Sequence, residues 1–289
     1  VFDSWSKWSA QYYSVCEAPS DPDMWQYTSS GSVPGISGPV DVNYWYGESL
    51  NDLEEITKKI DEVALQYESE LGEPTSEIMM DEQDGVVWRE YDNGGVYWSA
   101  SSGAHPVFGE IFSYWVADGG LHSSLGLPVG DPGSFTQNGG GIAQDFAGGS
   151  VHVSNDGVSA AVLSGPIRSE YVRRGFQAGQ LGWPIGDAEE LSGGGSLQRF
   201  QNGILIASSH GTFEMDGEMQ EYWERSGGAD GPLGYPLENT RYFSQNGGGY
   251  AADFEGGSLH WHWASNEAQR TAAVLSGPIR SEYVRRGFQ

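Results

Sequence analysis

The chain has 289 residues, of which 38% are hydrophobic, which is enough for one large domain or two smaller ones with a real core. With 40 acidic and 14 basic residues, its formal net charge is −26. This charge argues against nucleic acid, an anionic membrane surface or an anionic wall polymer as partner, because each needs lysine and arginine, whereas a neutral glycan is compatible. No apolar run approaches the ~18 residues of a membrane span, and no pattern indicates a cofactor.

Residues 1–47 are rich in aromatic side chains and predict short strands. The run Trp25-Gln-Tyr27-Thr indicates one strand and Val40-Asp41-Val-Asn-Tyr another, with a glycine- and proline-containing turn between them. Together these residues resemble the C-terminal end of the glycoside hydrolase family 25 lysozymes, which have a TIM-like barrel. The segment at residues 8–12 is similar to an earlier strand of that barrel.

That resemblance implies roles for three residues. Asp41 would lie at the strand ends, where such barrels place their active sites. Trp25 and Tyr27 would line the sugar groove, or alternatively pack in the barrel core. Glycosidases need two carboxylates about the scissile bond, and in this family an Asp-Xaa-Glu pair on an earlier strand supplies them. Residues 1–47 contain no such pair, and Asp187-Ala-Glu189 falls in a repeat turn, so we expect a lysozyme parent but no catalysis by this chain.

The ends of the sequence suggest missing segments. The chain opens on Val1 rather than a methionine, and residues 272–289 are an identical copy of residues 160–177. We therefore expect further sequence on both sides. Cys16 is the single cysteine, and we expect it to be free or paired outside this sequence, with no catalytic role.

Residues 48–70 predict a helix that links the first segment to the rest, or that serves as the helix of a degenerate repeat. Asn51 and Glu54 fit a capping pair. Apolar residues recur every three or four positions, which indicates one amphipathic face: Leu53, Ile56, Ile60, Val63 and Tyr67.

From residue 71 the chain is organised by a recurring Leu-Gly-Xaa-Pro motif. It begins at Leu71, Leu125, Leu181 and Leu233, at spacings of 54, 56 and 52 residues. A period in this range indicates a repeat architecture. We predict units 71–124, 125–180, 181–232 and 233–289, each a β-hairpin plus a helix, too small to bury its own apolar face without its neighbours.

The second unit shows how the predicted helix is built. Pro166 suits a first helical turn, and Ile167 and Tyr171 are four residues apart, so they share one face. Gly175 is placed to be the left-handed residue beyond the helix end. The other units have equivalent pairs: Ile111 with Trp115, Met219 with Trp223, and Ile279 with Tyr283.

Four motifs in register resemble the LGFP repeat family over roughly residues 71–289. The first unit fits best, with Tyr97-Trp98-Ser, then Gly103-Ala-His105. The resemblance implies a secreted, cell-envelope-associated module that anchors wall-active enzymes by binding polysaccharide. The third unit departs from the pattern, because Ile206-Ala207 replaces Tyr97-Trp98.

Together these patterns predict an α+β, mainly β, fold. It would consist of a remnant of the last strands of a TIM-like barrel, followed by hairpin-plus-helix repeats. We favour a ring or propeller-like array of the repeats over an open stack.

Sugar sites need exposed aromatic faces and polar groups. Equivalent strand positions of the units supply the candidates, and because adjacent strand residues face opposite sides, we expect one column in the core and one exposed. The candidate sugar-binding residues are Tyr97, Trp98, His105, His152, His260 and Trp261.

Alternatives exist for some of these candidates. Trp98 and Trp261 are equally consistent with the core column, and His105 with a structural hydrogen bond. His260 and His262 flank Trp261, but no third ligand stands at metal-site spacing, so we predict no metal. Asp145 and Asp253 lack the acidic spacing of a calcium loop.

The leading functional hypothesis is the wall-binding region of a secreted, cell-wall-associated peptidoglycan hydrolase, with this chain itself inactive. Its partner would be a neutral wall glycan such as arabinogalactan, or peptidoglycan. The alternative is a structural or adhesive envelope repeat protein without sugar specificity.

Overall fold

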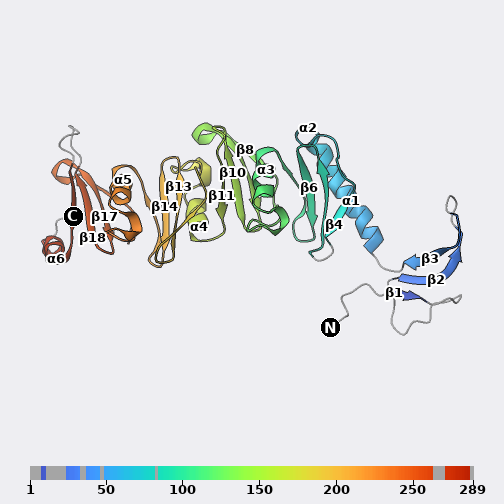
Figure 1. The fold of residues 1–289 in the computed structure, drawn as a ribbon. Coiled ribbons are helices and arrows are strands. Elements are labelled where there is room, and N and C mark those ends of the chain that lie inside the picture. The colour runs from blue at the N-terminus through green and yellow to red at the C-terminus, as the bar shows by residue number, and fades with distance from the viewer. Residues whose placement is uncertain are drawn as a thin grey trace. The chain divides into compact units, whose positions relative to one another are not determined.

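The computed structural model describes residues 8–10, 24–32, 37–45, 49–81, 84–262 and 271–286. The chain divides into two compact units, Val1–Asp61 and Glu62–Gln289, whose elements are shown in Figure 1. The division falls inside helix α1 (Ser49–Gln66), which occupies most of the predicted linker and is followed by the short α2 (Glu68–Leu71). Cys16 lies outside the described residues.

The first unit contains one three-stranded sheet in the order β1 (Trp8–Ala10), β2 (Met24–Gly31) and β3 (Val40–Trp45). The predicted strands are thus confirmed. However, β1 pairs with β2 in parallel whereas β2 pairs with β3 antiparallel. A TIM barrel closes eight parallel strands, so this small mixed sheet gives the expected barrel remnant no support.

The second unit consists of four repeats, each a four-stranded antiparallel sheet followed by a helix. The sheets are β4–β7 (Met79–Asp81, Val86–Tyr91, Gly94–Ser99, Gly103–Phe108), β8–β11 (Gly133–Phe135, Gly141–Phe146, Gly149–Ser154, Ser159–Leu163), β12–β15 (Glu189–Leu191, Gly195–Phe200, Gly203–Ser208, Gly211–Met215) and β16–β19 (Arg241–Phe243, Gly249–Phe254, Gly257–His262, Thr271–Leu275). The helices are α3 (Gly109–Ala117), α4 (Pro166–Arg173), α5 (Gly217–Arg225) and α6 (Gly277–Arg285). Short 3₁₀ turns η1–η5 are Gly120–His122, Gln137–Gly139, Phe176–Ala178, Gly228–Asp230 and Gln245–Gly247. The mainly β prediction is confirmed.

The Leu-Gly-Xaa-Pro motif folds onto the hairpin turn of its own repeat. In repeat 3, the Gln201 N–H donates to the Trp183 carbonyl at 2.9 Å, and the Trp183 N–H donates to Gln201 Oε1 at 3.0 Å. Gly182 has φ +73°, and a Cβ there would lie 2.4 Å from Gln201 Oε1. The glycine is therefore needed both for the left-handed backbone and for the close approach.

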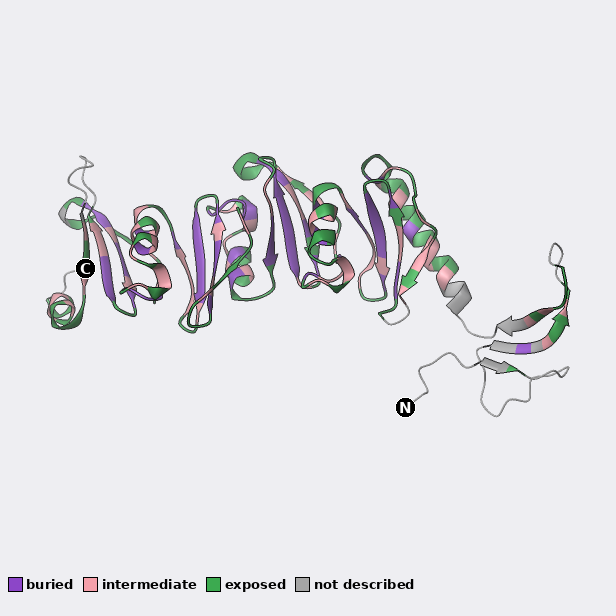
Figure 2. Cartoon of the chain, in the orientation of Figure 1, coloured by how far each residue is buried: buried purple, intermediate pink, exposed green. Residues whose placement is uncertain are grey.

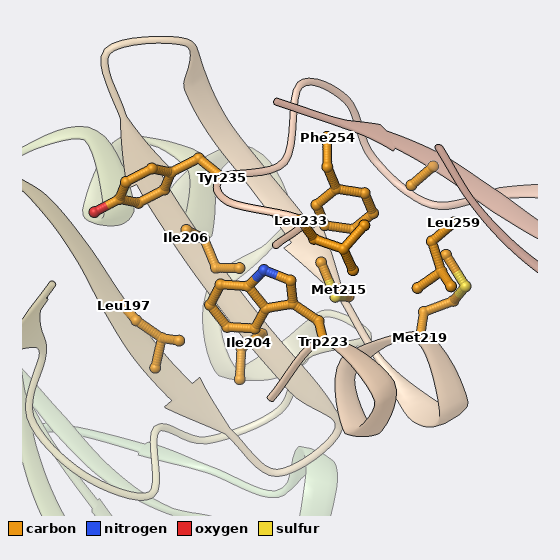
Figure 3. Packing of buried hydrophobic residues seen from close by; sticks show 11 residues of the cluster. Leu197, Ile204, Ile206, Met215, Met219, Trp223, Leu233, Tyr235, Phe254 and Leu259 are labelled. Carbon is orange, nitrogen blue, oxygen red and sulfur yellow. The ribbon is translucent and has the colours of Figure 1, made fainter. Parts of the chain in front are cut away.

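Each helix between two repeats packs against its own sheet and the next one. Helix α3 contacts β6 and β7 of repeat 1 and also β10 and β11 of repeat 2. Its Trp115 meets Tyr97 edge-on at 4.8 Å between ring centroids. Figure 2 shows buried residues concentrated in the central strands. Figure 3 shows the equivalent core between repeats 3 and 4, where Trp223 of α5 lies among apolar side chains of both repeats.

Hydrogen bonds from these helices lock consecutive repeats together. An aromatic side chain of each helix donates to the glycine carbonyl of the next Leu-Gly motif, in each case at 2.8 Å: Trp115 to Gly126, Tyr171 to Gly182, and Trp223 to Gly234. Buried glutamines add a second link, as Gln198 Nε2 donates to the Ala161 carbonyl at 2.7 Å. These contacts stack each repeat on the next. They give no support to the ring that we expected.

The predicted helix signals are confirmed in α4. Pro166 lies in its first turn, Gly175 follows its end at φ +92°, and Ile167 and Tyr171 are buried. Helix α6 has the same sequence, yet its Ile279 is 70% exposed, against 5% for Ile167. The difference arises because repeat 3 covers α4, so burial here is a property of neighbouring repeats rather than of the helix alone.

Candidate functional site

The residues predicted to bind sugar lie mostly inside the repeats. Tyr97 and His152 are buried, while Trp98, His260 and Trp261 are half-buried. The expectation of one exposed column is wrong, because the sheets lie between helix layers that cover both faces. Asp41 is exposed in β3, and the side chains of Trp25 and Tyr27 lie outside the described residues.

His105 holds repeats 1 and 2 together. Its Nδ1 lies 2.8 Å from Asp131 Oδ1, and its Nε2 lies 3.0 Å from the Ser102 carbonyl oxygen. Asp131 also accepts a hydrogen bond from the Tyr67 hydroxyl at 3.1 Å. Both ring nitrogens of His105 are therefore engaged in structural contacts.

Repeat 2 contains a cavity of about 170 Å³ between its sheet and the end of α4. Its lining combines two phenylalanines, Phe135 and Phe176, with several polar side chains. At ~30 Å³ per water molecule, the cavity would hold about six waters. The lining residues are Gly130, Asp131, Gly133, Phe135, Ala143, Gln144, Asp145, Ser150, His152, Phe176 and Gln177.

His152 is the central polar group of this cavity. Its Nε2 lies 3.0 Å from Ser150 Oγ, whereas its Nδ1 has no hydrogen-bond partner among the described residues. Burial, with a smaller contribution from the charge of Arg168, lowers the pKa of His152 to about 3. The ring is therefore neutral at physiological pH, and Nδ1 can act as donor or acceptor according to the tautomer.

Other polar groups of the cavity also lack partners. Within the described part of the chain, the buried Oε1 atoms of Gln144 and Gln177 accept no hydrogen bond. At the rim, Arg168 Nη2 forms an ion pair with Asp145 Oδ1 at 2.8 Å. Buried polar atoms are nearly always paired, by protein, water or ligand. Gln198, at the position of Gln144 in repeat 3, also has an unpartnered Oε1, so His152 is the group that distinguishes the cavity of repeat 2.

Repeat 4 has a counterpart cavity of about 320 Å³. Here Arg280 pairs with Asp253 at 2.8 Å, and Ser258 Oγ donates to Asp253 Oδ1 at 2.5 Å. Burial lowers the pKa of His260, which is less deeply enclosed than His152. Five lining residues are identical to those at the same positions of repeat 2: Phe243, Ala251, Asp253, Ser258 and His260.

The odd repeats lack this arrangement. The cross-strand partner of His152 is Ala143, and that of His260 is Ala251. The equivalent pairs are Trp88 with Tyr97 in repeat 1 and Leu197 with Ile206 in repeat 3. Repeat 3 does have a cavity of about 280 Å³ in the same place, but an Arg199–Glu224 ion pair borders it and it contains no histidine.

Sequence reasoning identified the two histidines but missed Ser150, Arg168 and their counterparts. A signal was present in the sequence: repeats 2 and 4 both have an alanine nine residues before the histidine, Ala143 before His152 and Ala251 before His260. Among the described residues, no group of three or more histidine, cysteine or acidic residues could hold a metal ion. Within the same residues, no helix is long and apolar enough to cross a bilayer.

The second unit is thus a repeat protein in which sheets and helices alternate along the chain. The LGFP repeat model matches residues 71–123, 125–179, 181–231 and 233–289. The chain therefore belongs to the LGFP repeat family, a family of cell-envelope repeats. Nothing found supports the expected glycoside hydrolase family 25 domain or a lysozyme parent.

A comparison with curated proteins finds no match. Among solved structures, virginiamycin B lyase from Staphylococcus aureus is 13% identical with a TM-score of 0.14, covering 73% of this chain and 59% of that one. Streptogramin B lyase is 16% identical with a TM-score of 0.14, covering 71% of this chain and 55% of that one. The chain thus spans little more than half the length of these enzymes, and such low TM-scores carry no inference about it.

Proposed function

We propose that the repeat region binds a neutral polysaccharide of the cell envelope, as a secreted, wall-associated module without catalytic activity of its own. The observation that carries this proposal is the cavity of repeat 2, whose lining includes Phe135, Phe176 and the buried His152, and His152 Nδ1 has no hydrogen-bond partner among the described residues. Aromatic faces pack against the apolar side of a sugar ring, while a few polar groups meet its hydroxyls.

Charge supports the choice of a neutral glycan. The net charge of −26 disfavours anionic polymers, and Arg168 at the rim is already paired with Asp145. Binding would therefore rest on hydrogen bonds and ring contacts. We expect it to persist in moderate salt and in the presence of EDTA.

The proposal is tested by changing Ala143 to leucine, the residue that repeat 3 has at this position. The larger side chain would lie beside His152 and cover its ring. Sedimentation with purified arabinogalactan or peptidoglycan would give the affinity of each variant, and a thermal melt would confirm folding. We expect Ala143→Leu to weaken binding at least ten-fold.

Ala147→Gln is the matched control, because Ala147 is exposed in the β9–β10 turn and does not line the cavity. Its binding should equal that of the wild type. Failure of the wild-type chain to bind either polymer would overturn the proposal, as would unchanged binding by a folded Ala143→Leu variant.

A purely structural or adhesive role is the second candidate. It is favoured by the placement of Tyr97 and His105, which serve packing and inter-repeat contacts. In that case, the repeats would act as a spacer and show no saturable binding of any wall polysaccharide.

A further inference from the structure

We propose that repeats 2 and 4 form a matched pair of sites that grips one polysaccharide chain at two points, with repeat 3 as the spacer. The inference rests on the proposed glycan binding and adds that the natural ligand is a polymer rather than a short sugar. It also assigns the site of repeat 4, including Asp253, Ser258 and Arg280, to ligand binding.

The two sites are built from the same parts. In each, an alanine of the second strand lies opposite the histidine of the third, as Ala143 does to His152 and Ala251 to His260. In each, an arginine of the helix pairs with the aspartate of the second strand at 2.8 Å. Two cavities that share five residues at the same positions, although Ala252 replaces Gln144 and Arg241 replaces Gly133, would recognise the same class of sugar.

Repeat 3 interrupts this chemistry. The position of the histidine is taken by Ile206, which is buried in the core between repeats 3 and 4. Ile204 stands where the even repeats have serine. The ion pair also differs. In repeat 3 the strand supplies the arginine, Arg199, and the helix supplies the acidic residue, Glu224. Specific sites therefore recur every second repeat.

The spacer is held firmly between the sites. Arg174, just after α4 in repeat 2, forms an ion pair with Glu214 of repeat 3 and donates to Asn239 Oδ1 of repeat 4 at 3.3 Å. Gln198 of repeat 3 donates to the Ala161 carbonyl of repeat 2. Contacts that link three successive repeats fix the separation of the two sites, so little freedom is lost when both engage one polymer.

Such a pair predicts avidity. Once one site holds a segment of the polymer, the second binds at a raised effective concentration, which can strengthen binding by ~10²–10⁴ without any new contact. A short oligosaccharide that cannot reach both sites gains nothing. It would instead fill the two sites independently.

The experiment compares four chains: wild type, Ala143→Leu, Ala251→Leu and the double variant. Each is titrated by calorimetry with a short arabinogalactan oligosaccharide and by sedimentation with the intact polymer. We expect two short sugars per wild-type chain, one per single variant and none for the double variant. On the polymer, either single change should reduce affinity about 10²-fold.

His152→Gln and His260→Gln repeat the comparison without enlarging a side chain, and thermal melts confirm folding. A stoichiometry of one for the wild type, or wild-type polymer binding by either single variant, would overturn the pairing while leaving the proposed function intact. If the wild type bound neither the short sugar nor the polymer, both the pairing and the proposed function would fall.

Discussion

The Tyr171 hydroxyl donates a hydrogen bond to the Gly182 carbonyl oxygen at 2.8 Å. This contact joins α4 of repeat 2 to the Leu-Gly-Xaa-Pro motif of repeat 3. Trp115 and Trp223 make the same contact at the other two junctions. The motif is therefore a joint between repeats as well as a feature of each one.

Removing this hydroxyl should destabilise the protein. Tyr171→Phe keeps the ring, which packs on Phe200 with centroids 4.6 Å apart, but leaves the Gly182 carbonyl without its donor. An unsatisfied buried acceptor costs about 1–3 kcal/mol. Urea denaturation measures the loss. Tyr242→Phe is the control, because Tyr242 is 65% exposed and should lose almost nothing.

Gly182 and Gly186 offer a second matched comparison. Gly182→Ala would force a side chain into the left-handed region, at about 1–2 kcal/mol, and press on Gln201. Gly186 has ordinary φ, and a Cβ there would meet no described atom within 4 Å. We expect a clear fall in melting temperature for the first alanine variant and none for the second. Equal melting temperatures would show that the turn tolerates a side chain.

The repeat fold could be read from sequence because its signals are local. The period of Leu-Gly-Xaa-Pro, the proline at the helix start and Gly175 beyond its end all act within one repeat. The arrangement of the repeats could not be predicted. It depends on contacts between repeats, such as those of Gln198 and Tyr171, that the sequence period does not encode. For the same reason, the sequence did not show that helices of neighbouring repeats cover both faces of each sheet.

The candidate site was predicted only in part for a related reason. Tyr97 and His152 occupy equivalent positions, so sequence treated them alike. Both pack on the aromatic of their own helix, Tyr97 on Trp115 and His152 on Tyr171. They differ across the strands, because Tyr97 lies against Trp88, whereas His152 lies opposite the small Ala143 and lines a cavity. Whether a strand residue is packing or ligand-binding depends on its cross-strand neighbour, which register alone reveals.

The buried histidine predicts a pH dependence of stability. Because the pKa of His152 falls to about 3 on folding, the unfolded chain, with a histidine pKa near 6.5, binds a proton that the folded chain does not. Stability should therefore fall as pH drops from about 6.5 to 5, with His152 contributing up to ~1.4 kcal/mol per pH unit and His260, whose pKa burial also lowers, adding to the same fall. Carboxylates with lowered pKa, such as Glu170, contribute only at lower pH.

Chemical denaturation across this range tests the prediction. His152→Gln should flatten the pH profile by about one proton relative to the wild type. A profile for His152→Gln that runs parallel to the wild type would contradict the assignment of a neutral, buried histidine.

We expect no muramidase activity from this chain. Residues 1–47 supply no Asp-Xaa-Glu pair, and glycoside hydrolysis needs two placed carboxylates. The measurement is turbidity of a cell-wall suspension with purified protein. Clearing above the buffer control would contradict the prediction.

The hairpin turn of repeat 2 offers a stabilising change. In the other repeats, the turn residue accepts a hydrogen bond from the backbone N–H of Xaa in the motif: Asp92 from Glu73 at 3.1 Å, Gln201 from Trp183 at 3.0 Å and Glu255 from Tyr235 at 3.0 Å. Repeat 2 has Ala147 there, whose side chain cannot accept.

Ala147→Gln would supply the missing acceptor for the Leu127 N–H at an exposed position, where the longer side chain meets little hindrance. A net gain of about 0.5–1.5 kcal/mol is expected for such a bond. Gln201→Ala, the reverse change in repeat 3, should cost a similar amount. Urea denaturation of both variants measures the pair, and because neither residue lines the cavity of repeat 2, sugar binding should stay constant while stability moves in opposite directions.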